Sequence, residues 1–238
     1  GRPANLGIMD GEEGPTDLYY FLKSYYEVSE NPAYIKLTLE PEGEYVISQP
    51  LAVIAAIEIL GDEKKPATID ASQLGAQPFV KIFNQWRPTE DPDENDFYHT
   101  IYNVAFTNIN VKGLKGQVFY ANKQKYLLPY LTVDNCQFRM EGATNKTFFD
   151  FNGGGFVEDF TINNSTLSAD DATKWSNGGF FSTQSGTTFA ACGAEKQSFT
   201  LTNNTFYNVA KGKTLSTLRE NSKNFMYFTV LNNIVVNS

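Results

Sequence analysis

The stretch FTLTNNTF, residues 199–206, decides the fold of this chain because its pattern recurs along the sequence. Four other stretches begin and end with apolar residues in the same way: VAFTNINV from Val104, LTVDNCQF from Leu131, FTINNSTL from Phe160 and FTVLNNIV from Phe228. The first half of each copy has apolar residues at alternate positions, which is typical of a strand. The fifth position is asparagine in every copy, giving Asn108, Asn135, Asn164, Asn203 and Asn232.

The spacing of the copies predicts a stacked-repeat architecture. The five asparagines are separated by 27, 29, 39 and 29 residues, and a period in this range is typical of a solenoid. The intervals contain a second aromatic or β-branched segment bounded by Gly, Asn or Ser, as in TFFDFNGGG, GGFFSTQSG and TLSTLRENS. Two or three short strands per turn predict an all-β fold, a single-stranded parallel β-helix.

Two columns of stacked side chains are expected in such a solenoid. The five asparagines should form a ladder in which each amide donates to a neighbouring turn and to local backbone. The next position varies among Ile109, Cys136, Ser165, Asn204 and Asn233, so we expect it to be less constrained. Four residues that close the copies should form one interior column: Phe138, Leu167, Phe206 and Val235.

The first part of the chain predicts a cap and the opening turns. Residues 17–28 place Leu18, Leu22 and Tyr25 at helical spacing, with Thr16 or Asp17 as the residue that caps the helix. Such a helix would cover the exposed hydrophobic end of the solenoid. Strands are expected at 34–39, 44–48, 51–60 and 67–70, with a turn at Gly61 and the charged residues after it.

The domain organisation follows from these elements. Residues 1–16 read as a leader that begins with a protease-cleavage scar, and 17–238 read as one β-helix domain with asparagine-ladder turns over 104–238. The last copy ends close to Ser238, so we expect either a partner or the continuation of a longer, truncated chain to cover the final turn.

Composition limits the classes of partner. With 41% hydrophobic and 19% charged residues the chain can bury a sizeable core. The net charge of −8 argues against nucleic acid and against insertion into an anionic membrane surface. The longest apolar run, LAVIAAI, is too short to span a bilayer. Cys136 and Cys192 allow at most one disulfide, and the sequence leaves open whether they are bridged.

The stretch LAVIAAIEILGDEKKPATIDAS, residues 51–72, resembles the opening turn of pectate-lyase-like right-handed β-helix proteins, in which an x-I-x-I-x-G strand precedes Lys-Pro-x-I-Asp. The N-N-x-F strings resemble the asparagine-ladder turns of that superfamily. Over about residues 35–238 the resemblance implies a right-handed parallel β-helix. More narrowly, the chain is similar to uncharacterised β-helix domains of bacterial surface lipoproteins associated with polysaccharide utilisation. This implies an extracellular or outer-surface location in a bacterium, with a lipid anchor on a removed N-terminal segment.

Candidate ligand-binding residues are chosen for carbohydrate chemistry. Trp86, Arg87 and Trp175 flank polar loops where an exposed indole could stack on a sugar ring, although each Trp also fits core or loop packing. Local alternation places a further set of polar side chains outward on the second strand of each turn: Asp150, Asn152, Gln184, Arg219 and Glu220.

Catalysis and metal binding have few candidates. A pectate-type lyase needs an Arg or Lys base, for which Arg219 beside Glu220 is the candidate, although a solvated surface pair also fits. The acidic run 89–97 offers Asp91, Asp93 and Asp96 to Ca²⁺, but it lacks the Gly and the bidentate Glu of a calcium loop, so a flexible loop also fits. No other cofactor is expected. A single histidine, His99, leaves no histidine metal cluster.

Three functions remain open at this point. The first is a non-catalytic surface β-helix that binds or helps to present a polysaccharide or oligosaccharide. The second is a structural or adhesin-like spacer of a larger envelope protein, with further domains of the same chain as partners. The third is a Ca²⁺-dependent polysaccharide lyase. The superfamily that the chain resembles includes lyases, hydrolases, esterases and binding proteins with no known activity, so its fold does not decide among the three functions.

Overall fold

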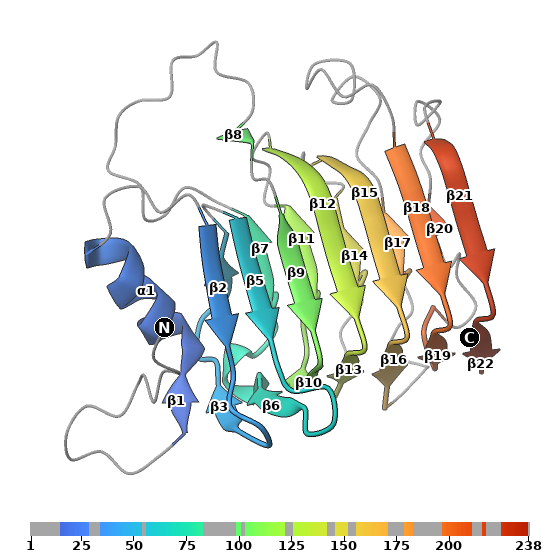
Figure 1. Cartoon of the computed structure of the whole chain (residues 1–238). Helices are drawn as coiled ribbons and strands as arrows, with labels where there is room; N and C mark the ends of the chain where they lie inside the picture. The colour runs from blue at the N-terminus through green and yellow to red at the C-terminus, as the bar shows by residue number, and fades with distance from the viewer. Residues whose placement is uncertain are drawn as a thin grey trace.

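The structure is a computed structural model that describes residues 15–28, 34–53, 56–82, 99–100, 103–121, 126–141, 146–151, 156–170, 179–182, 197–210, 216–217 and 225–237. These residues form a parallel β-helix of three stacked sheets, with one short helix near the N-terminus (Figure 1). Every strand pair in the three sheets is parallel. The all-β solenoid predicted from the repeats is therefore confirmed.

Each full turn contributes one strand to each sheet. Sheet B contains β2 (Tyr34–Thr38), β5 (Ala56–Leu60), β9 (Val104–Thr107), β12 (Tyr126–Asp134), β15 (Phe156–Asn163), β18 (Gln197–Thr202) and β21 (Phe225–Leu231), with β8 (His99–Thr100) paired to β12. Sheet A contains β1 (Thr16–Asp17), β3 (Glu44–Val46), β6 (Ala67–Asp70), β10 (Ile109–Leu114), β13 (Gln137–Met140), β16 (Thr166–Ala169), β19 (Thr205–Tyr207) and β22 (Ile234–Val236). Sheet C contains β4 (Leu51–Ala52), β7 (Val80–Ile82), β11 (Phe119–Ala121), β14 (Phe149–Asp150), β17 (Phe181–Ser182) and β20 (Ser216–Thr217).

The repeats map onto this plan directly. Each eight-residue copy is a strand of sheet B, a corner at the asparagine and a strand of sheet A, as in β18 followed by β19. The aromatic or β-branched segments between copies supply β14, β17 and β20 of sheet C. Thus the second strand expected in each turn is present, although it is only two residues long.

Inward positions stack into apolar columns. Phe160, Phe199 and Phe228 lie one above another, with ring centroids 5.3 and 5.1 Å apart and nearly parallel planes. Phe138, Leu167 and Phe206 form a fully buried column, as the sequence predicted. Val235 continues the register of that column but is 53% exposed, because no described strand packs on β22 from the far side. Val235 thus belongs to the predicted column by register but is not buried.

The strand expected at 51–60 is two strands in different sheets. β4 ends at Ala52 in sheet C and β5 begins at Ala56 in sheet B, so the chain turns a corner between them. Leu51, Ala52 and Val53 are all buried, which shows why an unbroken apolar run concealed the corner. No polar residue or glycine marks the change of sheet in this part of the sequence.

The N-terminal end of the stack is covered by α1 (Leu18–Val28), as predicted. Leu18 and Leu22 are buried on its inner face, and Figure 1 shows the helix beside the first strands. Of the two expected cap residues, Asp17 makes the contact, because its carboxylate accepts a hydrogen bond of 2.9 Å from the backbone N–H of Tyr19.

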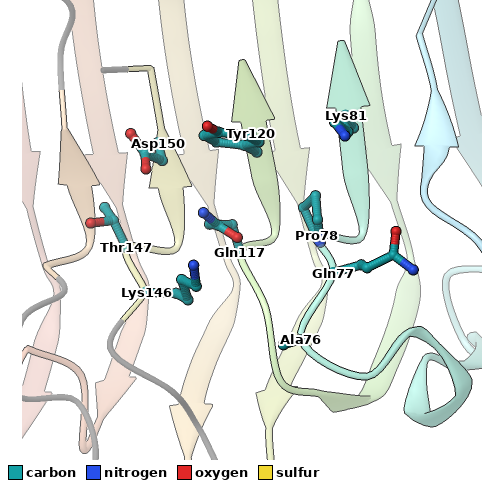
Figure 2. A pocket seen from close by; sticks show the side chains of 9 residues that line it. All are labelled: Ala76, Gln77, Pro78, Lys81, Gln117, Tyr120, Lys146, Thr147 and Asp150. Carbon is teal, nitrogen blue, oxygen red and sulfur yellow. The ribbon is translucent and has the colours of Figure 1, made fainter. Parts of the chain in front are cut away.

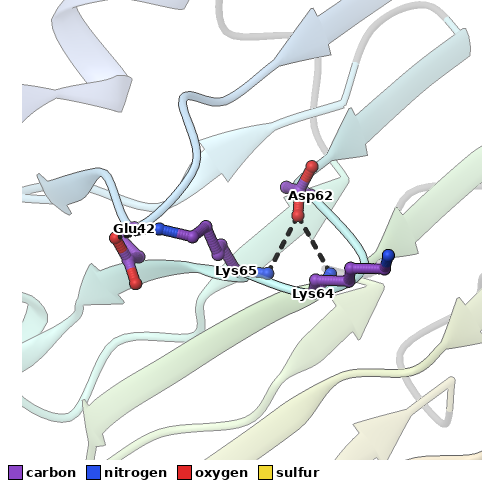
Figure 3. A network of polar contacts seen from close by, with 4 residues as sticks. All are labelled: Glu42, Asp62, Lys64 and Lys65. Atoms are coloured by element: carbon purple, nitrogen blue, oxygen red, sulfur yellow. Dashed lines mark hydrogen bonds and ion pairs between the residues drawn. The ribbon is translucent and has the colours of Figure 1, made fainter.

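The turn between β5 and β6 is held by local polar contacts (Figure 3). The Asp62 carboxylate accepts hydrogen bonds of 2.9 Å from the backbone N–H groups of both Lys64 and Lys65. The Lys65 ammonium lies 2.9 Å from Glu42 of the preceding turn. Gly61 begins this turn because a Cβ there would lie 2.1 Å from the carbonyl oxygen of Asn108. The charged residues after Gly61 thus form the turn that the sequence indicated.

The five repeat asparagines share one backbone conformation. Their φ angles lie between 50° and 58°, in the left-handed region that asparagine tolerates better than most residues. Their side chains are exposed or half-buried and do not form a continuous ladder. Asn135 donates to Asn108 over 2.8 Å and Asn232 to Asn203 over 3.3 Å, whereas Asn164 donates to Asp134. Asparagine is therefore needed at the corner mainly for its φ angle.

The buried ladder lies one position later, contrary to our expectation that this position is less constrained. The backbone N–H of Cys136 donates to Ser165 Oγ, that of Ser165 to Asn204 Oδ1, and that of Asn204 to Asn233 Oδ1, over 2.9–3.1 Å. Asn204 is 1% exposed and also donates through Nδ2 to the carbonyl of Ile162. Side chains of different types can fill this column, because each has to supply only one acceptor to the backbone N–H of the preceding turn.

Candidate ligand-binding cleft

The outer face of sheet C carries a row of polar side chains. Register pairs Lys81 of β7 with Tyr120 of β11, and Tyr120 with Asp150 of β14. Their sequence neighbours Val80, Phe119 and Phe149 point inward and are buried. Because side chains alternate along a strand, the buried neighbours fix the three polar side chains on the outer face. Figure 2 shows them in line across the three strands.

This row forms one wall of a cleft of about 500 Å³, which we call the sheet C cleft. The remaining lining comes from the segments that lead into the same strands: Ala76, Gln77, Pro78, Gln117, Lys146 and Thr147 (Figure 2). The volume lies within the usual range for small-molecule pockets, ~300–1,000 Å³. The cleft therefore has room for a few sugar units or a ligand of similar size.

The backbone beneath the cleft is closely packed. A Cβ at Gly116 would lie 2.2 Å from the carbonyl oxygen of Gln77, so only glycine fits at this contact. The N–H of Phe79 donates to the carbonyl of Gln117 over 2.8 Å, and the N–H of Val80 donates to that of Val118 over 3.0 Å. The cleft is thus built on hydrogen-bonded neighbouring turns, and its side chains are held at a defined spacing.

The chemistry of the cleft suits a polar ligand. Two lysines and one carboxylate line it, so its formal charge is positive in a chain whose net charge is −8. The amides of Gln77 and Gln117 and the hydroxyl of Thr147 can donate or accept hydrogen bonds, and Tyr120 offers an aromatic ring. Within the described ranges, no group of three or more His, Cys, Asp and Glu residues could hold a metal ion.

Of the ligand-binding residues expected from the sequence, the structure describes Asp150 alone, and it lines the cleft. The others lie outside the described residues: Trp86, Arg87, Asn152, Trp175, Gln184, Arg219 and Glu220. The same holds for Asp91, Asp93 and Asp96 of the acidic run and for Cys192. The strand that contains His99 pairs with β12 in sheet B.

Lys81 and Tyr120 were not among the site residues expected from the sequence. Lys81 in FVKI and Tyr120 in VFYA each follow an apolar residue of a short strand. The alternation that placed Asp150 on the outer face would therefore have placed these two residues there as well. Gln77, Gln117 and Lys146 lie on connections outside the strands, where alternation gives no direction.

Cys136 is a free thiol at the opposite corner of the solenoid. It is buried, and burial raises the pKa of its thiol to about 12. Its sulfur contacts the carbonyl oxygens of Phe106 and Asp134 at 3.4 and 3.2 Å. A protonated and buried thiol of this kind has a packing role rather than a nucleophilic one.

Comparison with known proteins adds one partial similarity. Residues 89–170 match the family model described as Domain of unknown function (DUF4957). That span includes β9 to β16 and therefore Tyr120 and Asp150 of the cleft. No curated protein and no solved structure matches the chain. No helix among the described residues is long and apolar enough to cross a membrane.

Proposed function

We propose that this protein is a non-catalytic β-helix that binds an oligosaccharide segment of a polysaccharide in the sheet C cleft. The observation that carries the proposal is the row of Lys81, Tyr120 and Asp150, which sets an aromatic ring between two charged groups on one face of sheet C. Sugars are recognised by such a combination, because a ring face stacks on the apolar side of a pyranose while polar groups bond to its hydroxyls.

The charges favour a sugar that carries acidic groups. Lys81 and Lys146 supply two ammonium groups against the single carboxylate of Asp150. The resemblance of residues 51–72 to pectate-lyase-like proteins is a second argument for a polysaccharide ligand. A location on the bacterial cell surface is part of this proposal and rests on the resemblance to surface lipoproteins.

The test is binding of oligogalacturonate fragments by isothermal titration calorimetry. We expect Tyr120→Ala and Lys81→Gln each to weaken binding about tenfold, because each removes one of the groups that contact the sugar. The matched control is Lys112→Gln, which removes an exposed lysine from the outer face of sheet A. Equal affinities for all four proteins would place the ligand elsewhere, and no binding by the parent chain would favour the spacer function.

A second assay separates binding from catalysis. The protein is incubated with polygalacturonate and Ca²⁺, and the absorbance of an unsaturated product is followed. We expect no increase above a blank. A steady increase would replace the binding proposal with the lyase function.

A further inference from the structure

A second polar surface lies on sheet B, which is a different face of the solenoid from the cleft. Four threonines occupy one register position on β12, β15, β18 and β21: Thr132, Thr161, Thr200 and Thr229. We call them the threonine row. Because the strands are parallel and in register, successive hydroxyls repeat at the strand spacing of ~4.8 Å. Figure 1 shows these four strands side by side as one continuous sheet.

The row is flanked on one side by exposed aromatic rings. Two residues before the threonines, register aligns Tyr130, Asp159, Ser198 and Tyr227. Tyr130 is 50% exposed and Tyr227 is 60% exposed. Three strand steps separate the two rings, which corresponds to ~14 Å along the solenoid axis. The face therefore presents two aromatic side chains with Asp159 and Ser198 between them, and the threonine row runs parallel to this line, two residues further along the strands.

The polar neighbours of the row already bond to one another. Asn163 donates to Asp134 over 3.1 Å, and Thr202 donates to Asn163 over 2.5 Å. Ser198 donates to Asp159. The four hydroxyls of the threonine row, by contrast, make no hydrogen bond with any described residue. Their donors and acceptors are thus available to a ligand, on a surface where the neighbouring polar side chains are hydrogen-bonded to one another.

The charge of this face limits the ligand class. The strands β12, β15, β18 and β21 contain no lysine or arginine, whereas Asp134 and Asp159 add negative charge to the surface. An anionic glycan, a nucleic acid or an anionic membrane would be repelled here. A neutral ligand rich in hydroxyl groups is compatible with it.

We infer that this face binds an extended neutral glycan lying across the strands. The length of one pyranose in an extended β-linked chain is close to one strand step, so successive sugars can meet successive threonine hydroxyls. Tyr130 and Tyr227 stack on sugar rings at the two ends of the bound segment. The protein then has two carbohydrate surfaces, a basic cleft on sheet C and a neutral to acidic platform on sheet B.

Titration of the full 238-residue chain with cellohexaose and with xylohexaose tests the inference. We expect measurable binding of at least one hexasaccharide, and an affinity at least tenfold weaker for the double variant Tyr130→Ala, Tyr227→Ala. Tyr207→Ala is the matched control, because Tyr207 is a comparably exposed tyrosine on the outer face of sheet A. Its affinity should equal that of the parent chain.

Two further variants keep the outcome decisive. If loss of both tyrosines unfolds the chain, Thr161→Lys with Thr200→Lys places two long side chains across the row and should abolish binding. Tyr120→Ala in the cleft should leave neutral binding unchanged, which separates this site from the proposed function. The inference is overturned if neither hexasaccharide binds, if the variants on sheet B bind as tightly as the parent, or if the cleft variant alone loses neutral binding.

Discussion

Asn203 and Asn204 are adjacent in the sequence, but their side chains lie in different surroundings. Asn203 has a left-handed φ of 58° and an exposed side chain, whereas Asn204 is buried and serves as acceptor for Ser165 and donor to Ile162. A pair of asparagines thus combines a backbone requirement at the first position with a hydrogen-bonding requirement at the second.

The second position should matter more for stability. Asn204→Leu leaves the buried N–H of Ser165 and the buried carbonyl of Ile162 without that partner, which should lower the free energy of unfolding by about 2–5 kcal/mol. Asn203→Gly keeps the left-handed conformation and should cost less than about 1 kcal/mol. Urea unfolding followed by circular dichroism compares the two. A larger loss for Asn203→Gly would show that the outer asparagines hold the turns together.

Cys136 should make stability depend on pH in the alkaline range. Burial raises the pKa of its thiol from the ordinary value of 9.0 to about 12 in the folded chain, so the folded state retains a proton that the unfolded state releases. The free energy of unfolding should therefore fall as pH rises above 9, by up to ~1.4 kcal/mol per pH unit until pH 12.

The control for this effect is Cys136→Ala. All other titrating groups are common to both proteins, so the difference between their unfolding free energies at successive pH values isolates the thiol. We expect the parent chain to lose stability more steeply than the variant between pH 9 and 10.5. Parallel curves would contradict a buried, protonated thiol.

At the level of elements, the strands and corners that recur in every copy of the repeat could be predicted from the sequence. The strand, corner and strand of each copy follow from period-two alternation and an asparagine, and β14, β17 and β20 follow from aromatic or β-branched residues between turn signals. The corner between β4 and β5 was missed, because both sides of it are buried and its residues are apolar. A corner can be recognised in a sequence where a positive φ angle requires asparagine or glycine, or where exposure to solvent favours polar residues.

The same limit applies to the cleft. Alternation was enough for Asp150 and would have been enough for Lys81 and Tyr120, because strands give a side chain a definite face. Gln117 and Lys146 reach the cleft from connections, and their positions depend on how neighbouring turns stack. The inner ladder was missed for another reason, since Cys136, Ser165 and Asn204 differ in type while they occupy one structural position.

At the scale of the whole molecule, the two ends of the solenoid differ. Helix α1 buries the first turn beneath Leu18 and Leu22. On the last turn, inward Phe228 is more than half exposed, and so are the outward residues Leu231 and Ile234. On the preceding turn, Thr202 pairs with Leu231 and Thr205 pairs with Ile234. The outer surface therefore changes from polar to apolar at these two positions of the last turn.

Among the described residues, the edge formed by β21 and β22 has only one of the features that usually protect an edge strand, a shift of register in β21 beside Gln197 and Ser198. Soluble proteins place charges, prolines or bulges on exposed edges, because an unpaired strand otherwise pairs with another chain. Strands β21 and β22 contain no charged residue and no proline. We therefore predict that the 238-residue chain associates with itself through this edge, with a mass above that of one chain that increases with protein concentration.

Light scattering coupled to size-exclusion chromatography measures this association. The double variant Leu231→Lys, Ile234→Lys should run as a monomer, because two ammonium groups on one edge repel a second copy and add solvation to the open strands. Tyr20→Lys places a charge on the exposed face of α1 and serves as the control, so its association should match that of the parent chain. A parent chain that stays monomeric at high micromolar concentration would show that the apolar edge is not sufficient for pairing.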